Sequence, residues 1–209
     1  DLFTGKFAHY DVVAYYEKIG PISMKTEIVS YGITELEVEE NRLSSRDRFC
    51  FSEHYSNLPF TTKVDDNFTR AIVPKKVFVK VWLQNGSINL LRPPTPTLLG
   101  ADLEDLVNEQ LPTEMNDPRL IDADNDGKPG VTVKLKIYNK FKAELYITRK
   151  EVFEYQMTVT EKGKIDGIVV DSSQQSVIGA RPGILKSQRN PEQNPDLSLS
   201  PIKLRLVND

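Results

Sequence analysis

The sequence contains few of the residues on which disulfide-rich, zinc-dependent and nucleophilic proteins rely. Of its 209 residues, one is cysteine and two are histidine. A single cysteine, Cys50, forms neither an internal disulfide nor a cysteine metal cluster. The two histidines, His9 and His54, lie too far apart in the chain for an HExxH zinc motif. The chain also has no G-x-S-x-G nucleophile turn and no phosphate-binding G-x-x-x-x-G-K loop.

Long apolar runs and an excess of basic residues are also absent. No apolar stretch reaches the roughly 18 residues of a membrane-spanning helix, so we expect no such helix. Asp and Glu number 30 against 27 Lys and Arg, which gives a net charge of -3. General nucleic-acid binders depend on a basic surface, so we do not expect nucleic acid as a partner.

What the sequence does contain is a succession of strand-length segments in which apolar and polar residues alternate. Residues 77–82 and 131–138 alternate with a period of two, and turn residues recur about every ten positions. Glu40-Asn41 and Asn85-Gly86 mark two of these turns. The pattern predicts a single all-β domain over residues 1–209, in which an antiparallel meander closes into a β-barrel. A β-sandwich is the alternative.

Residues 92–130 are expected to form an insertion within this domain. The proline-rich run at residues 92–96 should stop regular strand pairing, because proline has no N–H to donate. Residues 101–109 have the sequence ADLEDLVNE, which would bring Leu103, Leu106 and Val107 to one face of a helix. We therefore predict one short helix, followed by an acidic loop.

The acidic loop carries the most specific motif of the chain. Asp122, Asp124, Asp126 and Gly127 match the first half of an EF-hand calcium loop, D-x-D-x-D-G. Alternate carboxylates suit a hard cation because a tight turn directs them to one centre, and the glycine permits the bend. Val133 stands where an EF-hand has its bidentate glutamate, and a strand pattern follows instead of a helix. The sequence predicts a calcium loop that leads into a strand.

Two further residues are candidates for the same metal shell. Lys128 would contribute its backbone carbonyl, and Asp117 is the nearest carboxylate that could replace the missing glutamate. Residues 102–126 hold nine acidic residues and one basic residue, and crowded carboxylates repel one another unless a cation neutralises them. The alternative is a solvated turn without metal, since Asp, Asn and Gly form turns in any case.

Several short stretches allow a comparison with a known group of proteins. They are Leu111-Pro112, Asn116 to Arg119, Asp122 to Val133, Ile165 to Gly167, Val177 to Ala180 and Asn194 to Asp196. On these stretches, about the last hundred residues resemble uncharacterised secreted or lipid-anchored bacterial proteins of myxobacterial and spirochaete type. The resemblance implies an all-β fold with a calcium-type loop, and it implies no particular activity. The opening residues Gly5-Lys6-Phe7 resemble the first strand of lipocalins, with Phe7 where Trp is usual, which implies a lipocalin-like barrel.

Two other features have more than one interpretation. Cys50 and His54 would form a thiol–imidazole pair in a nucleophilic enzyme. The flanking residues Phe49 and Phe51 favour instead a structural thiol of low reactivity. The aromatic residues of the first strand either fill a core or line a cavity for an apolar ligand. These aromatic residues are Phe7, Tyr10, Tyr15 and Tyr16.

The leading hypothesis is a calcium-stabilised protein that acts by binding, and not as an enzyme. It would bind either a macromolecular partner or a small apolar ligand. The chain begins at Asp1 without Met, as a trimmed secreted form would. A calcium loop with few charged ligands binds calcium only at about 10⁻⁴–10⁻³ M, a concentration found outside the cytoplasm. This predicts a secreted, periplasmic or outer-surface protein. Membrane contact would occur only through a lipid anchor outside this chain. The alternative is a calcium-dependent hydrolase that uses Glu114 or Asp117 beside the loop.

Overall fold

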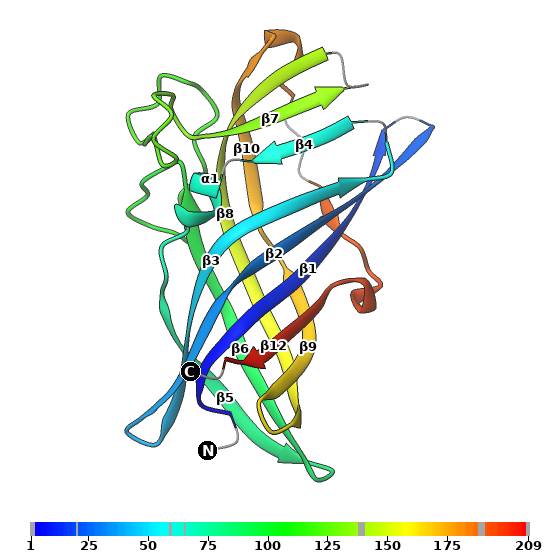
Figure 1. The fold of residues 1–209 in the computed structure, drawn as a ribbon. Helices are drawn as coiled ribbons and strands as arrows, with labels where there is room; N and C mark the ends of the chain where they lie inside the picture. Colours follow the sequence, from blue (N-terminus) through cyan, green and yellow to red (C-terminus); the bar gives the residue numbers. More distant parts are fainter. Residues whose placement is uncertain are drawn as a thin grey trace.

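The computed structural model describes residues 3–19, 21–58, 60–64, 66–137, 141–187 and 191–207, which form one 12-stranded sheet (Figure 1). The strands are β1 (Gly5–Ile19), β2 (Ile22–Glu39), β3 (Arg42–Ser56), β4 (Phe60–Val64), β5 (Lys76–Gln84), β6 (Ser87–Leu99), β7 (Val131–Ile137), β8 (Phe141–Glu161), β9 (Lys164–Asp171), β10 (Gln174–Arg181), β11 (Glu192–Gln193) and β12 (Pro201–Leu206). One short helix, α1 (Asp66–Arg70), and two 3-10 turns, η1 (Gly183–Leu185) and η2 (Leu197–Leu199), accompany them. Within the described ranges, no helix has the length and apolar character needed to cross a membrane.

The antiparallel pairings of the strands close a ring. Starting at β1, they run through β2, β3, β5, β6, β8, β9 and β12 and return to β1. The ring is uneven because each edge of the long strand β8 serves two partners. One edge pairs with β6 and then β7, and the other pairs with β9 and then β10. The predicted all-β antiparallel fold with one short helix is confirmed.

Two of the predicted turns have the backbone that tight hairpins require. Glu40 and Asn41, between β2 and β3, have φ angles of 48° and 63°. Asn85 and Gly86, between β5 and β6, have φ angles of 51° and 78°. Two consecutive positive φ angles are typical of the type I′ turn, whose twist matches that of the flanking strands. These turns fix the register of both hairpins.

The proline-rich run does not stop the sheet as predicted. Strand β6 continues through it, and its register to β8 shifts between Arg92 and Thr95. The irregularity falls on the two residues Pro93 and Pro94, which have no N–H for the ladder. The insertion therefore begins after Leu99 rather than at Arg92.

The helix predicted over residues 101–109 is wrong. Asp105 instead accepts hydrogen bonds from the backbone N–H groups of Val107 and Asn108 and from the Asn108 side chain. These local bonds lower the pKa of Asp105 and compete with the backbone ladder of a helix. The helix that does form, α1, lies instead between β4 and β5.

The buried apolar side chains form two clusters. The first fills the ring and contains Phe7, Val13, Tyr15, Leu36, Leu43, Val79, Leu90, Tyr155, Met157, Ile165, Val169, Ile202 and Leu204. The second lies where β4, α1, β7 and β10 join the sheet, and contains Val64, Phe68, Leu99, Val131, Val133, Ile147 and Val177. The second cluster borders the space described next.

Candidate functional site: an internal cavity and an acidic loop

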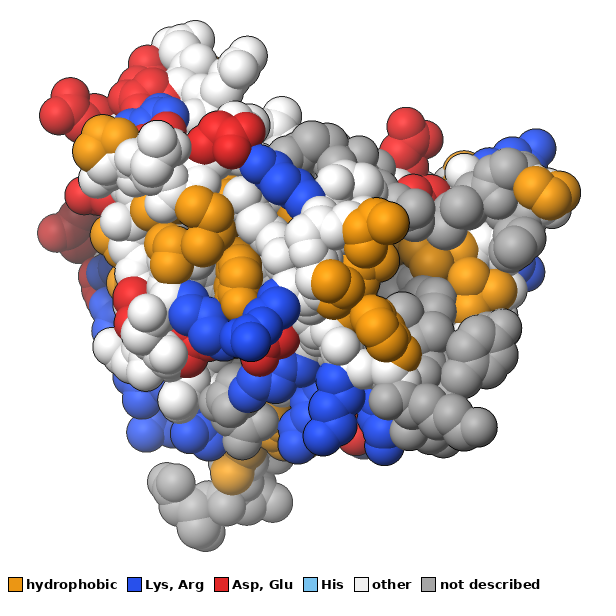
Figure 2. Space-filling model, turned by 90° about the horizontal axis from the view of Figure 1, so that it is seen from above, with side chains coloured by type: hydrophobic (Ala, Val, Ile, Leu, Met, Phe, Trp, Pro, Cys, Tyr) orange, Lys and Arg blue, Asp and Glu red, His pale blue; other side chains and the backbone are white. Residues whose placement is uncertain are grey.

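A cavity of about 420 Å³ lies between β1, β2, β3, β4, α1, β7, β8 and β10. In Figure 1, β4, β7 and β10 lie in the upper part of the molecule, which β1, β2, β3 and β8 also reach, and the view from above shows several patches of apolar side chains (Figure 2). Apolar side chains dominate its lining and include Val13, Met24, Ile28, Phe49, Phe68, Ile72, Val133, Leu135, Leu145, Ile147, Phe153 and Val177. The volume lies within the range of pockets that hold one small organic molecule.

The period of two along each strand brings these side chains into the cavity. On β7, Val133 and Leu135 face it, while the intervening Lys134 is exposed. On β8, every odd position from 145 to 153 lines it, and two of these positions are the charged residues Arg149 and Glu151. One face of β8 therefore supplies both the apolar wall and the charges.

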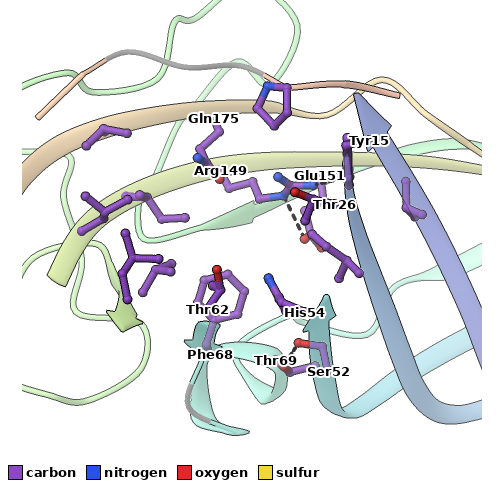
Figure 3. Close-up of a pocket in the computed structure, with 18 of the residues that line it drawn as sticks. Tyr15, Thr26, Ser52, His54, Thr62, Phe68, Thr69, Arg149, Glu151 and Gln175 are labelled. Carbon is purple, nitrogen blue, oxygen red and sulfur yellow. Dashed lines mark hydrogen bonds and ion pairs between the residues drawn. The ribbon is translucent and has the colours of Figure 1, made fainter. Parts of the chain in front are cut away.

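Arg149 and Glu151 form a buried ion pair at the edge of the cavity (Figure 3). Arg149 Nε donates to Glu151 Oε1 at 3.1 Å, and Arg149 Nη2 donates to the Tyr15 hydroxyl at 3.1 Å. The Tyr15 hydroxyl donates in turn to Asp171. Burial raises the pKa of Glu151 and outweighs the charge and the hydrogen bond of Arg149, which lower it, and the charge of Asp171 adds to the rise. Glu151 therefore takes up a proton more readily than an exposed glutamate.

His54 faces the same cavity from β3 (Figure 3). The register of β3 to β2 shifts between Phe49 and Phe51, so that Cys50 is the extra residue of a β-bulge. Beyond the bulge, Ser52 and His54 line the cavity, and the half-buried thiol of Cys50 is not among its lining residues. Burial, and then the charge of Arg149, lowers the pKa of His54 to about 4, so the ring is neutral at pH 7.

A second group of charged side chains lies deeper in the ring. His9 Nε2 is 2.6 Å from Asp11 Oδ2, and His9 Nδ1 is 2.7 Å from the Thr34 hydroxyl. That hydroxyl donates its one proton to Asp47 Oδ1 at 2.7 Å, and Arg92 Nε lies 2.9 Å from the other oxygen of Asp47. His9 must then donate from both nitrogens, which describes an imidazolium ion.

The electrostatics of the group agree with this protonation state. Burial lowers the pKa of His9, but the hydrogen bond to Asp11 and the charges of Asp11 and Asp47 outweigh it, so the pKa is raised. Two cations and two carboxylates then neutralise each other. His9 and Asp11 lie between Phe7 and Val13 in the period-two pattern of β1, so the charged group lies within the first apolar cluster, of which Val13 and Tyr15 also line the cavity.

The predicted calcium loop brings its three aspartates together. Asp122, Asp124 and Asp126 each offer a carboxylate oxygen within 4.8 Å of the others. Oxygens that ligate one calcium ion at about 2.3–2.6 Å are at most about 5 Å apart, so this group could hold a metal ion. The two oxygens of Asp122 accept from the backbone N–H groups of Asp126 and Gly127, which closes the turn.

Asp124 is the buried member of the three. It is 3% exposed, and its Oδ2 accepts from the backbone N–H of Thr132 at 2.8 Å. Its Oδ1 is buried and has no hydrogen-bond partner among the described residues. Burial, and after it the charges of Asp126 and Asp122, raises the pKa of Asp124. A buried carboxylate oxygen without a donor is unusual and would be satisfied by a cation.

Lys128 and Asp117 are the other two predicted ligands. The Lys128 ammonium is 3.0 Å from Glu144 and 3.5 Å from Asp126, so its side chain supplies positive charge beside the group. Asp117 does not join the cluster, because Arg119 binds both of its carboxylate oxygens and lowers its pKa to about 2. The geometry gives no support to Asp117 as the closing ligand.

Part of this site was predictable from the sequence. Of the four aromatic residues of the first strand, Tyr15 lines the cavity, Phe7 belongs to the ring core, and Tyr10 contacts Tyr31. The roles of His9, Asp11, Asp47, Arg92, Arg149 and Glu151 were not predicted. A signal was present in the run Phe7, His9, Asp11 and Val13, where polar residues occupy the positions of an inward-facing period of two. Comparisons of the chain with protein-family models, with curated proteins and with solved structures gave no match.

Proposed function

We propose that the protein binds a small, mainly apolar molecule in the cavity between β1, β2, β3, β7 and β8. The observation that carries this proposal is a cavity of about 420 Å³ whose lining is mostly apolar and also includes polar and charged side chains. Ligand sites generally combine these two features. The cavity favours a small ligand over the macromolecular partner that the sequence also allowed.

The alternative of a hydrolase gains no support from the acidic residues beside the loop. Glu114 forms an ion pair with Lys186 at 2.7 Å, and Asp117 forms one with Arg119 at 2.7 Å. Neither carboxylate lines the cavity. Binding without catalysis is therefore the function that we propose.

The two faces of β4 provide a matched test of the cavity. Thr62 lines the cavity, whereas its neighbour Thr61 is exposed on the outer face. An apolar fluorescent probe such as anilinonaphthalene sulfonate should bind the wild-type protein. Thr62→Trp should weaken its binding about tenfold or more, because the indole occupies the volume. Thr61→Trp should leave the affinity unchanged, and equal affinities for both variants would mean that the probe binds elsewhere.

A second candidate function, calcium binding at Asp122, Asp124 and Asp126, is favoured by the unpartnered oxygen of Asp124. The ion would supply the positive charge that this buried oxygen lacks. Binding of calcium to the folded state alone should raise the free energy of unfolding by about 2.7 kcal/mol at one hundred times Kd. Magnesium should stabilise much less, because it requires a small octahedral shell and releases its waters reluctantly. The low charge of the loop fits the calcium concentrations outside the cytoplasm, so we also propose a secreted or surface location.

Thermal melting with calcium and with EDTA tests this site. Asp124→Asn should abolish the calcium-dependent rise in Tm, because the amide keeps an oxygen for the Thr132 N–H but loses the charge. Asp102→Asn removes an exposed carboxylate outside the group and should preserve the rise. Asp117→Ala should also preserve it, because Arg119 holds that carboxylate. A wild-type melting curve that ignores both calcium and EDTA, in protein shown to be free of metal, would refute the site.

A further inference from the structure

The polar groups at the edge of the cavity are not all satisfied by the protein. Arg149 donates from Nε to Glu151 and from Nη2 to Tyr15, and across the described residues its Nη1 has no partner. The ring of His54 likewise has no hydrogen-bond partner in the described part of the chain. Figure 3 shows both side chains directed into the same space, with the Arg149–Glu151 bond beside them. The wall of an otherwise apolar cavity thus presents unused hydrogen-bond donors.

These donors restrict the chemistry of a ligand. A guanidinium is always charged and only donates, and a neutral imidazole has one N–H to donate. A carboxylate accepts from both and forms strong, charge-assisted bonds with Arg. The carboxyl of Glu151 has a raised pKa, so it can take up a proton, which relieves its repulsion of a second anion. An ammonium group only donates, and the charge of Arg149 would repel it.

The outer face of the same wall also favours an anion. Lys63 on β4 lies opposite Lys134 on β7, and Lys136 lies opposite Lys142 on β8. All four side chains are exposed, and none of them forms an ion pair within the ranges that the structure describes, although Glu144, which binds Lys128, lies opposite Lys134 on β8. Figure 2 shows Lys and Arg side chains gathered along one side of this end of the molecule. Such a strip attracts anions toward the end that holds the cavity.

We propose that the ligand of the cavity is a long-chain carboxylate, whose head group binds Arg149 and His54 and whose tail lies among Val133, Leu135 and Ile147. This inference rests on the proposed function, because it names the class of molecule that the cavity holds. The head group points inward to the ion pair, and the tail replaces contacts between water and the apolar wall.

A series of three ligands with one chain length tests the head group. Dodecanoic acid, its methyl ester and dodecylamine are titrated by displacement of the fluorescent probe. The acid should bind about tenfold or more tightly than the ester, as charge-assisted hydrogen bonds would give. The amine should bind most weakly. Equal affinities for acid and ester, or a preference for the amine, would overturn the carboxylate assignment and leave the cavity itself in place. Failure of all three ligands and of the probe would overturn the proposed function.

Variants then assign the contacts to the two side chains. His54→Phe removes the ring donor but retains a flat ring, and Arg149→Gln removes the charge. Each should lower the affinity for dodecanoic acid about tenfold and leave that for the methyl ester unchanged. Ser52→Ala, one inward position earlier on β3, should change neither affinity. His54 belongs to no ion pair among the described residues, so its variant decides the question if Arg149→Gln fails to fold. An equal loss for acid and ester in His54→Phe would overturn its role in head-group recognition.

Discussion

At the residue scale, His9 links the buried carboxylates Asp11 and Asp47. The side chain is 3% exposed, and its ring also packs edge-on against Phe49 and Tyr155 with centroids 5.2 and 5.7 Å away. A buried imidazolium is stable here only because both carboxylates lie close to it. Removal of one partner from such a group leaves a buried charge without compensation, which costs about 3–5 kcal/mol.

His9→Gln should therefore destabilise the fold by about 3–5 kcal/mol and change its pH dependence. The pKa of His9 is raised in the folded state, so its contribution to stability is complete below about pH 6.5 and is lost as the pH rises through the folded pKa. Urea unfolding of the wild-type protein should accordingly give a free energy that falls from pH 6.5 upward. The variant should lack this part of the decline.

His54→Gln is the control for this experiment. The pKa of His54 is lowered in the fold, so its effect on stability appears only as the pH falls below about 6.5. The control variant should retain the decline of the wild-type protein at higher pH. Parallel pH profiles for His9→Gln and the wild-type protein would mean that His9 is neutral in the folded state.

At the element scale, β7 carries the acidic loop into the cavity wall. Its inward residues Val131, Val133 and Leu135 alternate with the outward residues Lys134 and Lys136, as the sequence predicted. Thr132 is the exception, because the acidic loop covers it and Asp124 accepts from its N–H. One face of β7 therefore lines the cavity, and the beginning of the strand contacts the acidic loop.

This alternation gives opposite expectations for neighbouring positions. Leu135→Lys directs an ammonium into the apolar wall without a partner and should cost several kcal/mol or unfold the domain. Lys134→Glu should stay within about half a kcal/mol, since the outer face is exposed and Lys134 lies between Lys63 and Glu144. Urea unfolding measures both. A stable Leu135→Lys variant would contradict the register of β7.

Strands were predictable from the sequence where one face is apolar, and less so where charges interrupt that face. On β8 the apolar alternation of residues 143–147 and of residues 153–159 forms two separate patterns, because the charged pair Arg149 and Glu151 stands between them. Tyr15 on β1 and Asp171 on β9 reach Arg149 and Glu151 only through the order of the strands in the ring, in which β1 pairs with β12, β12 with β9 and β9 with β8. Such contacts depend on the register of distant strands, which local patterns do not encode.

The acidic loop was predictable because its ligands lie within one turn. The alternate spacing of Asp122, Asp124 and Asp126 is enough to bring them together, whatever the rest of the fold does. The prediction of a helix over residues 101–109 was wrong for a related reason. Apolar spacing there is helical, but the local hydrogen bonds of Asp105 stabilise a turn instead.

At the scale of the whole molecule, the acidic loop and the cavity share a rigid connection. Ala123 N–H donates to the Gly130 carbonyl at 3.2 Å, and Gly130 N–H donates to the Ile121 carbonyl at 2.9 Å. Gly130 has a φ of 85°, and a Cβ there would lie 2.5 Å from the carbonyl oxygen of Ile147, whose side chain lines the cavity. Backbones this close move together, so an ion that orders the loop also orders the wall.

Calcium should consequently raise the affinity of the cavity for its ligand. Coupling between two sites is typically about 1–3 kcal/mol, or roughly 5–150-fold, and the short path from Asp124 through Thr132 to Val133 makes a measurable effect the expected result. Dodecanoic acid is titrated into the wild-type protein with calcium and with EDTA. Asp124→Asn should remove the difference, and Asp102→Asn should keep it. Because coupling is reciprocal, saturating acid must raise the affinity for calcium by the same factor. Equal acid affinities with calcium and with EDTA would mean that the two sites act independently, and unequal factors in the two directions would mean that calcium acts on the acid and not on the protein.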